Sequence, residues 1–338
     1  MAQSPRVSDP SPYSSDPSPY SRDLPPYSSD PSPYSRDLPP YSGGGLDRAS
    51  THRTDPDWLA RARTLPGTRV LPLWQDDCIV RHDPARAVVL TGAPAQELIA
   101  AAGETVFLGL DAGAAVFAAD LSDLDQPAAV ALAGGDGTAS VRTVFTAHTP
   151  QEAATLGYAR GILHSIRNQR YCGRCGSPTQ PRDGGHVRAC PDCGRLLFPR
   201  IEPAVIMLVE SAADAQRCLL ARHRASVLGE FSTLAGFVET GESLEDAVRR
   251  EVSEEVGLRV GAVEYAGSQP WPFPAGLMVA FRATALDDTP VADGDEILEA
   301  RWFTRSELAE KAAAGSLGRV DSIDRVLLHS WLSAATQH

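Results

Sequence analysis

The chain has 338 residues, of which 43% are hydrophobic, and its formal net charge at pH 7 is −12. This length can supply two domains with their own cores, and the acidic balance argues against a protein that holds long nucleic acid by its phosphates. No apolar run approaches the ~18 residues of a transmembrane helix and the apolar segment of a signal peptide is lacking, so we expect a soluble, cytoplasmic protein without a membrane anchor.

A seven-residue repeat opens the chain between Asp9 and Ser42. In each unit an aspartate is followed four residues later by a tyrosine, with prolines between them, and three glycines end the run. Prolines exclude a coiled coil despite the heptad period, so we expect residues 1–45 to form an extended, disordered tail. Two interpretations remain open, a tail that binds a partner or is phosphorylated, and a tolerated low-complexity expansion. We favour the second, because the repeat supplies no catalytic chemistry.

Residues 46–169 are expected to form a mixed β/α domain. Short apolar runs separated by turn signals predict strands at 69–74, 78–81, 87–91 and 105–119, and residues 149–169 predict a helix that leads into the next segment. We find no catalytic constellation here, so a packing or dimerisation domain is the better interpretation.

Residues 170–200 contain two CxxC pairs separated by fourteen residues, formed by Cys172, Cys175, Cys190 and Cys193. This spacing resembles a zinc ribbon, in which four thiolates close a tetrahedral shell around Zn²⁺ and leave no open position. A closed shell makes the predicted zinc structural, and the pattern favours reduced thiols over a disulfide framework. His186 lies between the pairs and is interpreted as an ordinary surface histidine.

Residues 201–338 alternate strand and helix signals. Strands are expected at 204–209, 217–222, 234–238, 277–285 and 300–303, and helices from 304 and over 322–335. The prolines of Ser268–Pro274 exclude a central strand and predict a stiff loop that presents Trp271 and Phe273. These rings either stack on a flat ligand or fill the core, and the sequence leaves both open.

One acidic helix is expected to carry the chemistry. Ser243 is a plausible N-cap with Asp246 at the third helical position, a variant of the capping box, and Gly257 ends the helix. Helical geometry places Glu251 and Glu255 on the same face as the apolar side chains, with Glu254 on the flank. A solvated acidic helix is the alternative, but inward carboxylates are costly without a cation. Oxygen ligands suit Mg²⁺ or Mn²⁺, and such ions assist hydrolysis of a diphosphate bond.

The spacing from Gly236 through Glu242 to Arg250 and Leu258 resembles the Nudix box. Together with the four-cysteine ribbon and the SQPWPFP segment, it resembles the bacterial NADH pyrophosphatase family of Nudix hydrolases, from about Arg69 to the C-terminus. The resemblance implies an α/β (α+β) architecture, with a Nudix α/β/α sandwich preceded by the ribbon and the N-terminal mixed β/α domain.

The resemblance also implies site residues. The divalent cations would be bound by Glu251, Glu254 and Glu255, the last most tied to catalysis, with oxygens from Glu296 and the Ala235 carbonyl. Glu242 and Arg250 would pair to shape the loop that enters the helix. The substrate would contact Phe198, Phe237, Gln269, Pro270, Trp271, Pro272, Phe273, Pro274, Ala275, Gly276, Asp324 and Arg142.

Three of these residues depart from the family pattern at positions that bear on substrate choice. Gly276 and Phe198 stand where the family usually has serine and tyrosine, and Asp324 stands where a small alanine is usual. A carboxylate at that last position would repel phosphate or find another partner.

The function implied by the resemblance is metal-dependent hydrolysis of NADH, and more weakly NAD⁺, to nicotinamide mononucleotide and AMP, in a homodimer. Removal of NAD caps from RNA 5′ ends is also implied, with the RNA held by its cap. Two alternatives stay open: a Nudix diphosphatase for ADP-ribose or dinucleoside polyphosphates, and a zinc-ribbon protein that senses a nucleotide without cutting it.

Overall fold

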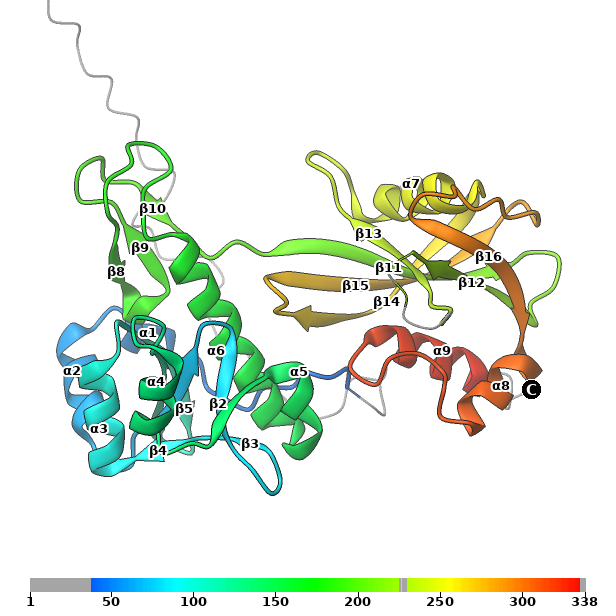
Figure 1. Ribbon diagram of the computed structural model, residues 1–338. Coiled ribbons are helices and arrows are strands. Elements are labelled where there is room, and N and C mark those ends of the chain that lie inside the picture. Colours follow the sequence, from blue (N-terminus) through cyan, green and yellow to red (C-terminus); the bar gives the residue numbers. More distant parts are fainter. Residues whose placement is uncertain (1–37, 225, 227–229, 335–338) are drawn as a thin grey trace, which may run out of the picture. The chain divides into compact units, whose positions relative to one another are not determined.

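The computed structural model of the protein describes residues 38–224, 226 and 230–334 (Figure 1). The chain divides into two compact units, Met1–Arg36 and Asp37–His338, and the structure described below belongs to the second. The first four units of the repeat therefore lie outside the described residues, as does Ala335 at the end of the last predicted helix.

The N-terminal part of this unit is built on a seven-stranded sheet with the order β3-β2-β1-β6-β5, in which β4 also pairs with β1 and β7 with β2. The strand predictions at 69–74 and 78–81 are confirmed, whereas 87–91 is two short strands and 105–119 is a hairpin of two. The strands are β1 Arg69–Trp74, β2 Asp77–Arg81, β3 Arg86–Ala87, β4 Leu90–Thr91, β5 Glu104–Asp111, β6 Ala114–Asp120 and β7 Gly137–Ser140.

Helices cover both faces of this sheet. The predicted helix before the ribbon is confirmed as α6, Pro150–Asn168, which starts at a capping box between Thr149 and Glu152. Its apolar face packs on one side of the sheet, and α2, α3 and α4 pack on the other. The remaining helices here are α1 Ser50–Arg53, α2 Pro56–Thr64, α3 Gly92–Ala101, α4 Gln126–Leu132 and α5 Val141–Val144, with a 3₁₀ turn at Phe145–Ala147.

The ribbon segment contains a three-stranded antiparallel sheet, and a six-stranded sheet follows it. The order of the larger sheet is β14-β15-β11-β12-β16, with β13 paired to β11. The small strands are β8 Gln180–Arg182, β9 Val187–Ala189 and β10 Leu196–Leu197. The large ones are β11 Glu202–Ser211, β12 Arg217–His223, β13 Leu234–Phe237, β14 Val260–Trp271, β15 Gly276–Ala285 and β16 Ile297–Thr304.

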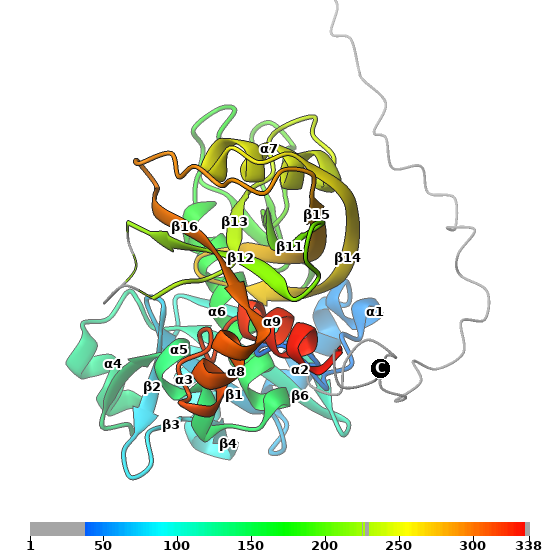
Figure 2. The ribbon, with the colours of Figure 1, turned by 90° about the vertical axis from the view of Figure 1, so that its right-hand side faces the viewer.

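The central strand β11 is buried on both faces. Val205, Met207 and Val209 pack with α7 (Leu244–Val256), while Ile206 and Leu208 pack with α9 (Ile323–Ala334). Successive residues of a strand point to opposite faces, so one strand supports both helix layers, and Figures 1 and 2 show α7 and α9 on opposite sides of the sheet. The expected α/β/α sandwich is confirmed. Helix α8, Arg305–Ala313, begins where a helix was predicted from 304, and a capping box of Thr304 and Glu307 starts it.

The SQPWPFP segment differs from its prediction. Ser268 to Trp271 continue strand β14 and pair with β15, from Val279 back to Gly276, so a loop was wrong for these residues. Strand β14 ends the strand order of the sheet, and an edge strand tolerates proline because one of its sides needs no ladder hydrogen bonds. Residues 272–275 form the turn between the two strands.

Among the described residues, no helix combines the length and the hydropathy needed to cross a membrane.

The last repeat unit belongs to the packed structure. Tyr41 is 3% exposed, and its ring centroid lies 5.6 Å from that of Phe145 and 5.3 Å from that of Phe273. The carbonyl of Pro40 accepts a hydrogen bond from Gln269 Nε2 at 3.0 Å. The disorder predicted up to residue 45 is therefore wrong at its C-terminal end, because these contacts join residues 229 positions apart.

We predict that Tyr41→Ala lowers the free energy of unfolding by about 3 to 5 kcal/mol, the usual cost of deleting a buried aromatic ring. Tyr41→Phe is the matched control, because the Tyr41 hydroxyl is buried without a hydrogen-bond partner among the described residues. Urea denaturation measures both variants. A wild-type midpoint for Tyr41→Ala would show that the ring contributes no packing energy.

Candidate functional site

Helix α7 carries the acidic residues and begins and ends as predicted. Ser243 Oγ accepts from the Asp246 amide at 3.2 Å, and Gly257 ends the helix in the left-handed conformation with φ of 66°. The capping box is altered, because the Asp246 carboxylate accepts from the Ser243 hydroxyl at 2.8 Å. Both ends of the helix are thus fixed by local contacts.

Arg250 is the centre of an ion-pair network. Its guanidinium donates to both oxygens of Glu242, at 2.8 and 2.9 Å, and to the Phe237 carbonyl at 2.8 Å. It also donates to Glu251 Oε1 at 2.8 Å and to Glu254 Oε2 at 3.0 Å. These hydrogen bonds, the one to Glu242 first, raise the pKa of Arg250, and the same contact lowers the pKa of Glu242. The predicted pair of Glu242 and Arg250 is present, and Arg250 also holds Glu251 and Glu254 through hydrogen bonds.

Position 236 requires a glycine, because a carboxylate lies too close to its backbone to leave room for a side chain. A Cβ atom added at Gly236 would lie 1.9 Å from Cδ of Glu251. The Glu251 carboxyl therefore rests against the backbone of strand β13, next to Ala235. Burial raises the pKa of Glu251, whereas Glu254 on the flank has a side chain that is 61% exposed.

Glu255 is the most unusual acid of the group. It is 3% exposed, and its Oε2 atom is buried without a hydrogen-bond partner among the described residues. Burial first, then the charges of Glu251 and Glu296, raise its pKa to about 8. Glu255 therefore lies where a cation would offset both the desolvation and the crowding of negative charge.

Glu255 has two neighbours suited to hold such a cation. One ligand atom each from His223, Glu255 and Glu296 lies within 4.8 Å of the others. Glu296 was predicted and His223 was not, although His223 directly follows the strand predicted at 217–222. The oxygens, the imidazole nitrogen and the unpaired Oε2 fit a divalent metal ion.

A cavity of about 640 Å³ is lined by His223 and Glu296 of this cluster. Four predicted residues line it: Ala235, Trp271, Glu296 and Asp324. Two guanidinium groups that the sequence did not single out, those of Arg224 and Arg319, line it as well. The other lining residues are Ile206, His223, Ser232, Thr233, Met278, Asp295 and Ser322.

Asp324 is hydrogen-bonded to a residue inside the protein. Its Oδ1 accepts from the amide of Thr233 at 3.0 Å and from the Thr233 hydroxyl at 2.7 Å. Burial raises the pKa of this carboxyl. A raised pKa favours the neutral acid, which would not repel a phosphate as strongly as a carboxylate does.

The two aromatic residues of the SQPWPFP segment share one contact and differ in another. Both rings pack against the N-terminal core, and Trp271 also lines the 640 Å³ cavity. Packing into the core is thus observed for both rings, and stacking on a ligand stays a prediction for Trp271. Pro274 contributes its carbonyl, which accepts from Arg160 at 3.1 Å.

The rest of the predicted substrate segment faces elsewhere. Gln269 is fully buried, and its amide binds the carbonyls of Pro40 and Asp321 and the amide of Ile323. Its hydrogen bonds are used within the protein. A second cavity, of about 670 Å³, is lined by Pro270, Pro272, Ala275 and Gly276 among others.

Three further predicted contacts lie outside the linings of both cavities. Arg142 donates to Asp321 at 2.8 Å, and its guanidinium carbon lies 5.0 Å from the centre of the Trp271 ring. Phe198 is 49% and Phe237 64% exposed. Arg142 thus packs against the Trp271 ring, and the side chains of the two phenylalanines are exposed at the surface.

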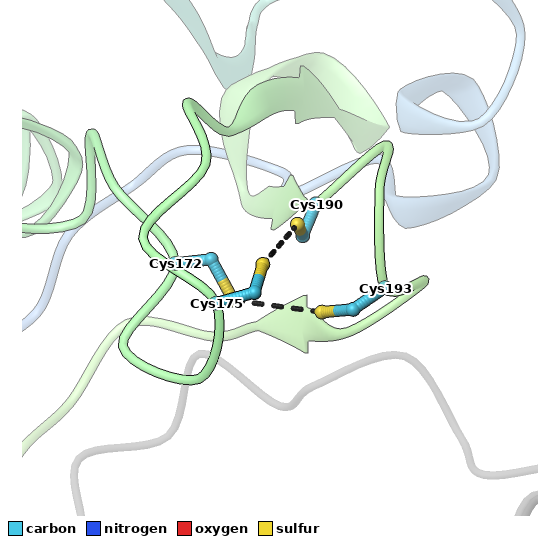
Figure 3. A group of neighbouring side chains, drawn as sticks. All are labelled: Cys172, Cys175, Cys190 and Cys193. Carbon is cyan, nitrogen blue, oxygen red and sulfur yellow. Dashed lines mark hydrogen bonds between the residues drawn. The ribbon is translucent and has the colours of Figure 1, made fainter.

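The four cysteines of the ribbon come together (Figure 3). Sγ of Cys172 lies 3.7 Å from that of Cys193, and Sγ of Cys175 lies 3.4 Å from that of Cys190. A tetrahedral Zn²⁺ with bonds of about 2.3 Å separates its sulfurs by about 3.8 Å, so the geometry fits zinc. A backbone hydrogen bond from Ser177 lowers the pKa of Cys175 to about 6, which favours the thiolate that zinc binds.

His186 does not lie free on the surface as predicted. One of its ring nitrogens, Nε2, lies 2.8 Å from the carbonyl of Phe107 and 3.3 Å from the hydroxyl of Tyr158. Burial lowers the pKa of His186 to about 4, so the imidazole is neutral at pH 7. It joins the ribbon to the N-terminal sheet and takes no part in the cysteine cluster.

Three family models match consecutive parts of the chain. Residues 67–164 match an NADH pyrophosphatase-like rudimentary NUDIX domain, 167–198 an NADH pyrophosphatase zinc ribbon domain and 200–322 a NUDIX domain.

Two relatives with similar sequences share one name. The NAD-capped RNA hydrolase NudC of Mycobacterium bovis is 39% identical over 304 residues, which are 85% of this chain and 92% of that protein. The protein of the same name from Pseudomonas aeruginosa is 46% identical over 164 residues, 48% of this chain and 58% of that protein. Among solved structures, a NUDIX hydrolase from Nitrosomonas europaea matches with a TM-score of 0.36 and 26% identity, over 41% of this chain and 80% of that one.

We predict that the cysteine cluster determines the zinc content. Because two remaining thiolates do not close a tetrahedral shell, the double variant Cys172→Ser/Cys175→Ser should retain far less than the one zinc per chain of the wild type. Mass spectrometry of the metal content measures this. The matched control Cys78→Ala/Cys218→Ala removes the two cysteines outside the cluster and should keep its zinc. Full zinc in the first variant would contradict a four-cysteine site.

We predict that without added divalent cations the protein loses stability as the pH rises from 5 to 8. The pKa of Glu255 is raised from 4.5 to about 8, so the folded state favours its protonated form and the stabilisation fades as pH passes through this range. At about 1.36 kcal/mol per pKa unit, the loss is on the order of several kcal/mol.

Urea denaturation at pH 5 and pH 8 tests this. Glu255→Gln should flatten the pH dependence, while Glu245→Gln, an exposed acid of the same helix, should keep that of the wild type. Mn²⁺ or Mg²⁺ should stabilise the wild type more at pH 8 than at pH 5. If the free energy of unfolding of Glu255→Gln depended on pH as it does in the wild type, the pH dependence would come from other acids.

Proposed function

Since the chain belongs to the NADH pyrophosphatase family of Nudix hydrolases, we propose that it hydrolyses the pyrophosphate bond of NADH and NAD⁺ to nicotinamide mononucleotide and AMP. The proposal includes removal of an NAD cap from RNA 5′ ends, the activity named for its relatives. In both cases a water oxygen bonds to one phosphorus, and the bridging P–O bond breaks.

One observation carries the proposal. The cavity lined by Glu296 and His223 is also lined by Trp271, so acidic groups and a flat apolar ring share one space. Acidic side chains suit the metal-bound pyrophosphate, and the indole suits stacking on a base or nicotinamide ring. The guanidinium groups of Arg224 and Arg319 add positive charge along the same cavity.

Glu251, Glu254, Glu255 and Glu296, with the Ala235 carbonyl, are proposed to hold the divalent cations, Mg²⁺ or Mn²⁺. When bound, such ions lower the pKa of water and neutralise the charge of the transferring phosphoryl group. The protein's own contribution is positional: Arg250 fixes Glu251 and Glu254, and packing of α7 fixes Glu255. Zn²⁺ in the ribbon is proposed to be structural.

The substrate contacts proposed from the sequence divide into two groups. Trp271 and Asp324 line the cavity, whereas Phe198 and Phe237 are exposed rings outside it. We propose a homodimer in which such exposed rings complete the substrate site. A cytoplasmic location is proposed as well, because reduced thiolates suit a reducing compartment.

We predict that the purified protein, given Mn²⁺ or Mg²⁺, converts NADH to the reduced mononucleotide and AMP. Glu255→Gln should reduce kcat by about 10²-fold or more, because it removes both a metal ligand and a group able to carry a proton. Chromatography of the products measures this, and Glu245→Gln serves as the control.

Three outcomes would count against the proposal. Rapid cleavage of ADP-ribose or dinucleoside polyphosphates without cleavage of NADH would reassign the substrate. Binding without cleavage would indicate a sensor. A wild-type rate in Glu255→Gln would overturn the role of that residue.

A further inference from the structure

A histidine stands beside the acids of the site. His223 is the last residue of β12, and one of its ring nitrogens lies within 4.8 Å of a carboxylate oxygen of Glu255 and one of Glu296. The oxygen-only ligand set implied by the sequence resemblance has no nitrogen donor. The observed cluster of His223, Glu255 and Glu296 adds the nitrogen donor that the implied set lacks.

A bulge at the end of β12 accounts for the position of His223. Arg222 pairs with Glu299, but His223 pairs with Ile297, so the register skips Leu298. Bulges change the direction of a side chain and are frequent at active sites. The shift brings His223 next to Ile297, whose preceding residue is Glu296.

The loop that carries Glu296 is held in place by Arg224. The Arg224 amide donates to the Glu296 carbonyl at 2.8 Å, and its guanidinium donates to the carbonyls of Asp295, at 2.5 Å, and Gly294, at 2.8 Å. His223 and Glu296 are thereby positioned by the same pair of strands. Such fixed placement is what a metal ligand requires.

The buried Oε2 of Glu255 gives a second, independent indication of a cation. This atom has no hydrogen-bond partner among the described residues, and Glu255 is 3% exposed. A buried carboxylate oxygen without a donor is costly, and a metal ion between Glu255, Glu296 and His223 would satisfy it.

We propose that His223 is a ligand of the metal centre formed with Glu255 and Glu296, and that its nitrogen makes this centre prefer Mn²⁺ over Mg²⁺. Mg²⁺ favours oxygen and water ligands, whereas a transition ion such as Mn²⁺ is less hard and accepts an imidazole nitrogen more readily than Mg²⁺ does. The inference rests on the proposed metal-dependent hydrolysis and specifies its metal.

Pulsed electron paramagnetic resonance of Mn²⁺ bound to the zinc-loaded protein, without substrate, tests the ligand directly. The wild type should show the ¹⁴N modulation of a bound imidazole, and His223→Ala should not. His82→Ala, which removes an exposed histidine outside the cluster, should keep the signal. Absence of ¹⁴N modulation in the wild type would overturn the proposal, even if the variant failed to fold.

Titration calorimetry with Mn²⁺ alone and with Mg²⁺ alone tests the preference. His223→Ala should weaken Mn²⁺ binding about tenfold or more, at least the cost of losing an outer-shell partner, and Mg²⁺ binding much less. Equal losses for both ions would overturn the preference. Neither measurement uses NADH, so a nitrogen signal would support His223 as a metal ligand even if the protein did not cleave NADH. Cleavage of NADH without a nitrogen signal would support the proposed function and exclude His223 as a ligand.

Discussion

The site depends on one costly arrangement, the three glutamates Glu251, Glu254 and Glu255 gathered toward the C-terminal end of helix α7, beside its buried valines. Arg250 offsets part of this cost, because it donates to Glu242, Glu251 and Glu254. The buried Oε2 of Glu255 has no donor within the part of the chain that the structure describes, and burial of Val248, Val252 and Val256 on the same helix holds Glu255 there. The apolar face thus stabilises an acid that would otherwise turn to solvent.

The pairing register of the strands places the other residues of the cavity next to these acids. Strand β11 supports α7 with one set of side chains and α9 with the other, and its neighbours β13 and β15 contribute Ala235 and Met278 to the cavity. The edge strand β14 ends at Trp271, and the bulge of β12 ends at His223. Each strand delivers a single group, so the cavity exists only when all of them pair in this register.

Residues far from the acids hold the Trp271 side of the cavity. Gln269 uses its whole amide to join Pro40, Asp321 and Ile323. Tyr41 and Arg142 pack against Trp271 itself, the latter while paired to Asp321. The last unit of a repeat without catalytic chemistry of its own thereby becomes part of the support of an aromatic ring in the site.

The sequence by itself determined the features that depend on neighbours along the chain. The helix from Ser243 to Gly257, the two CxxC pairs and the strands predicted before and after that helix follow from caps, spacing and alternation, and the family they indicate is confirmed. Tertiary structure decided that Tyr41 is buried and that Gln269 and Asp324 form hydrogen bonds inside the protein. It also decided the contacts of His186 and the position of His223 beside Glu255. Those features come from pairings between distant segments, and a one-residue bulge or the edge position of a strand leaves no periodic trace in the sequence.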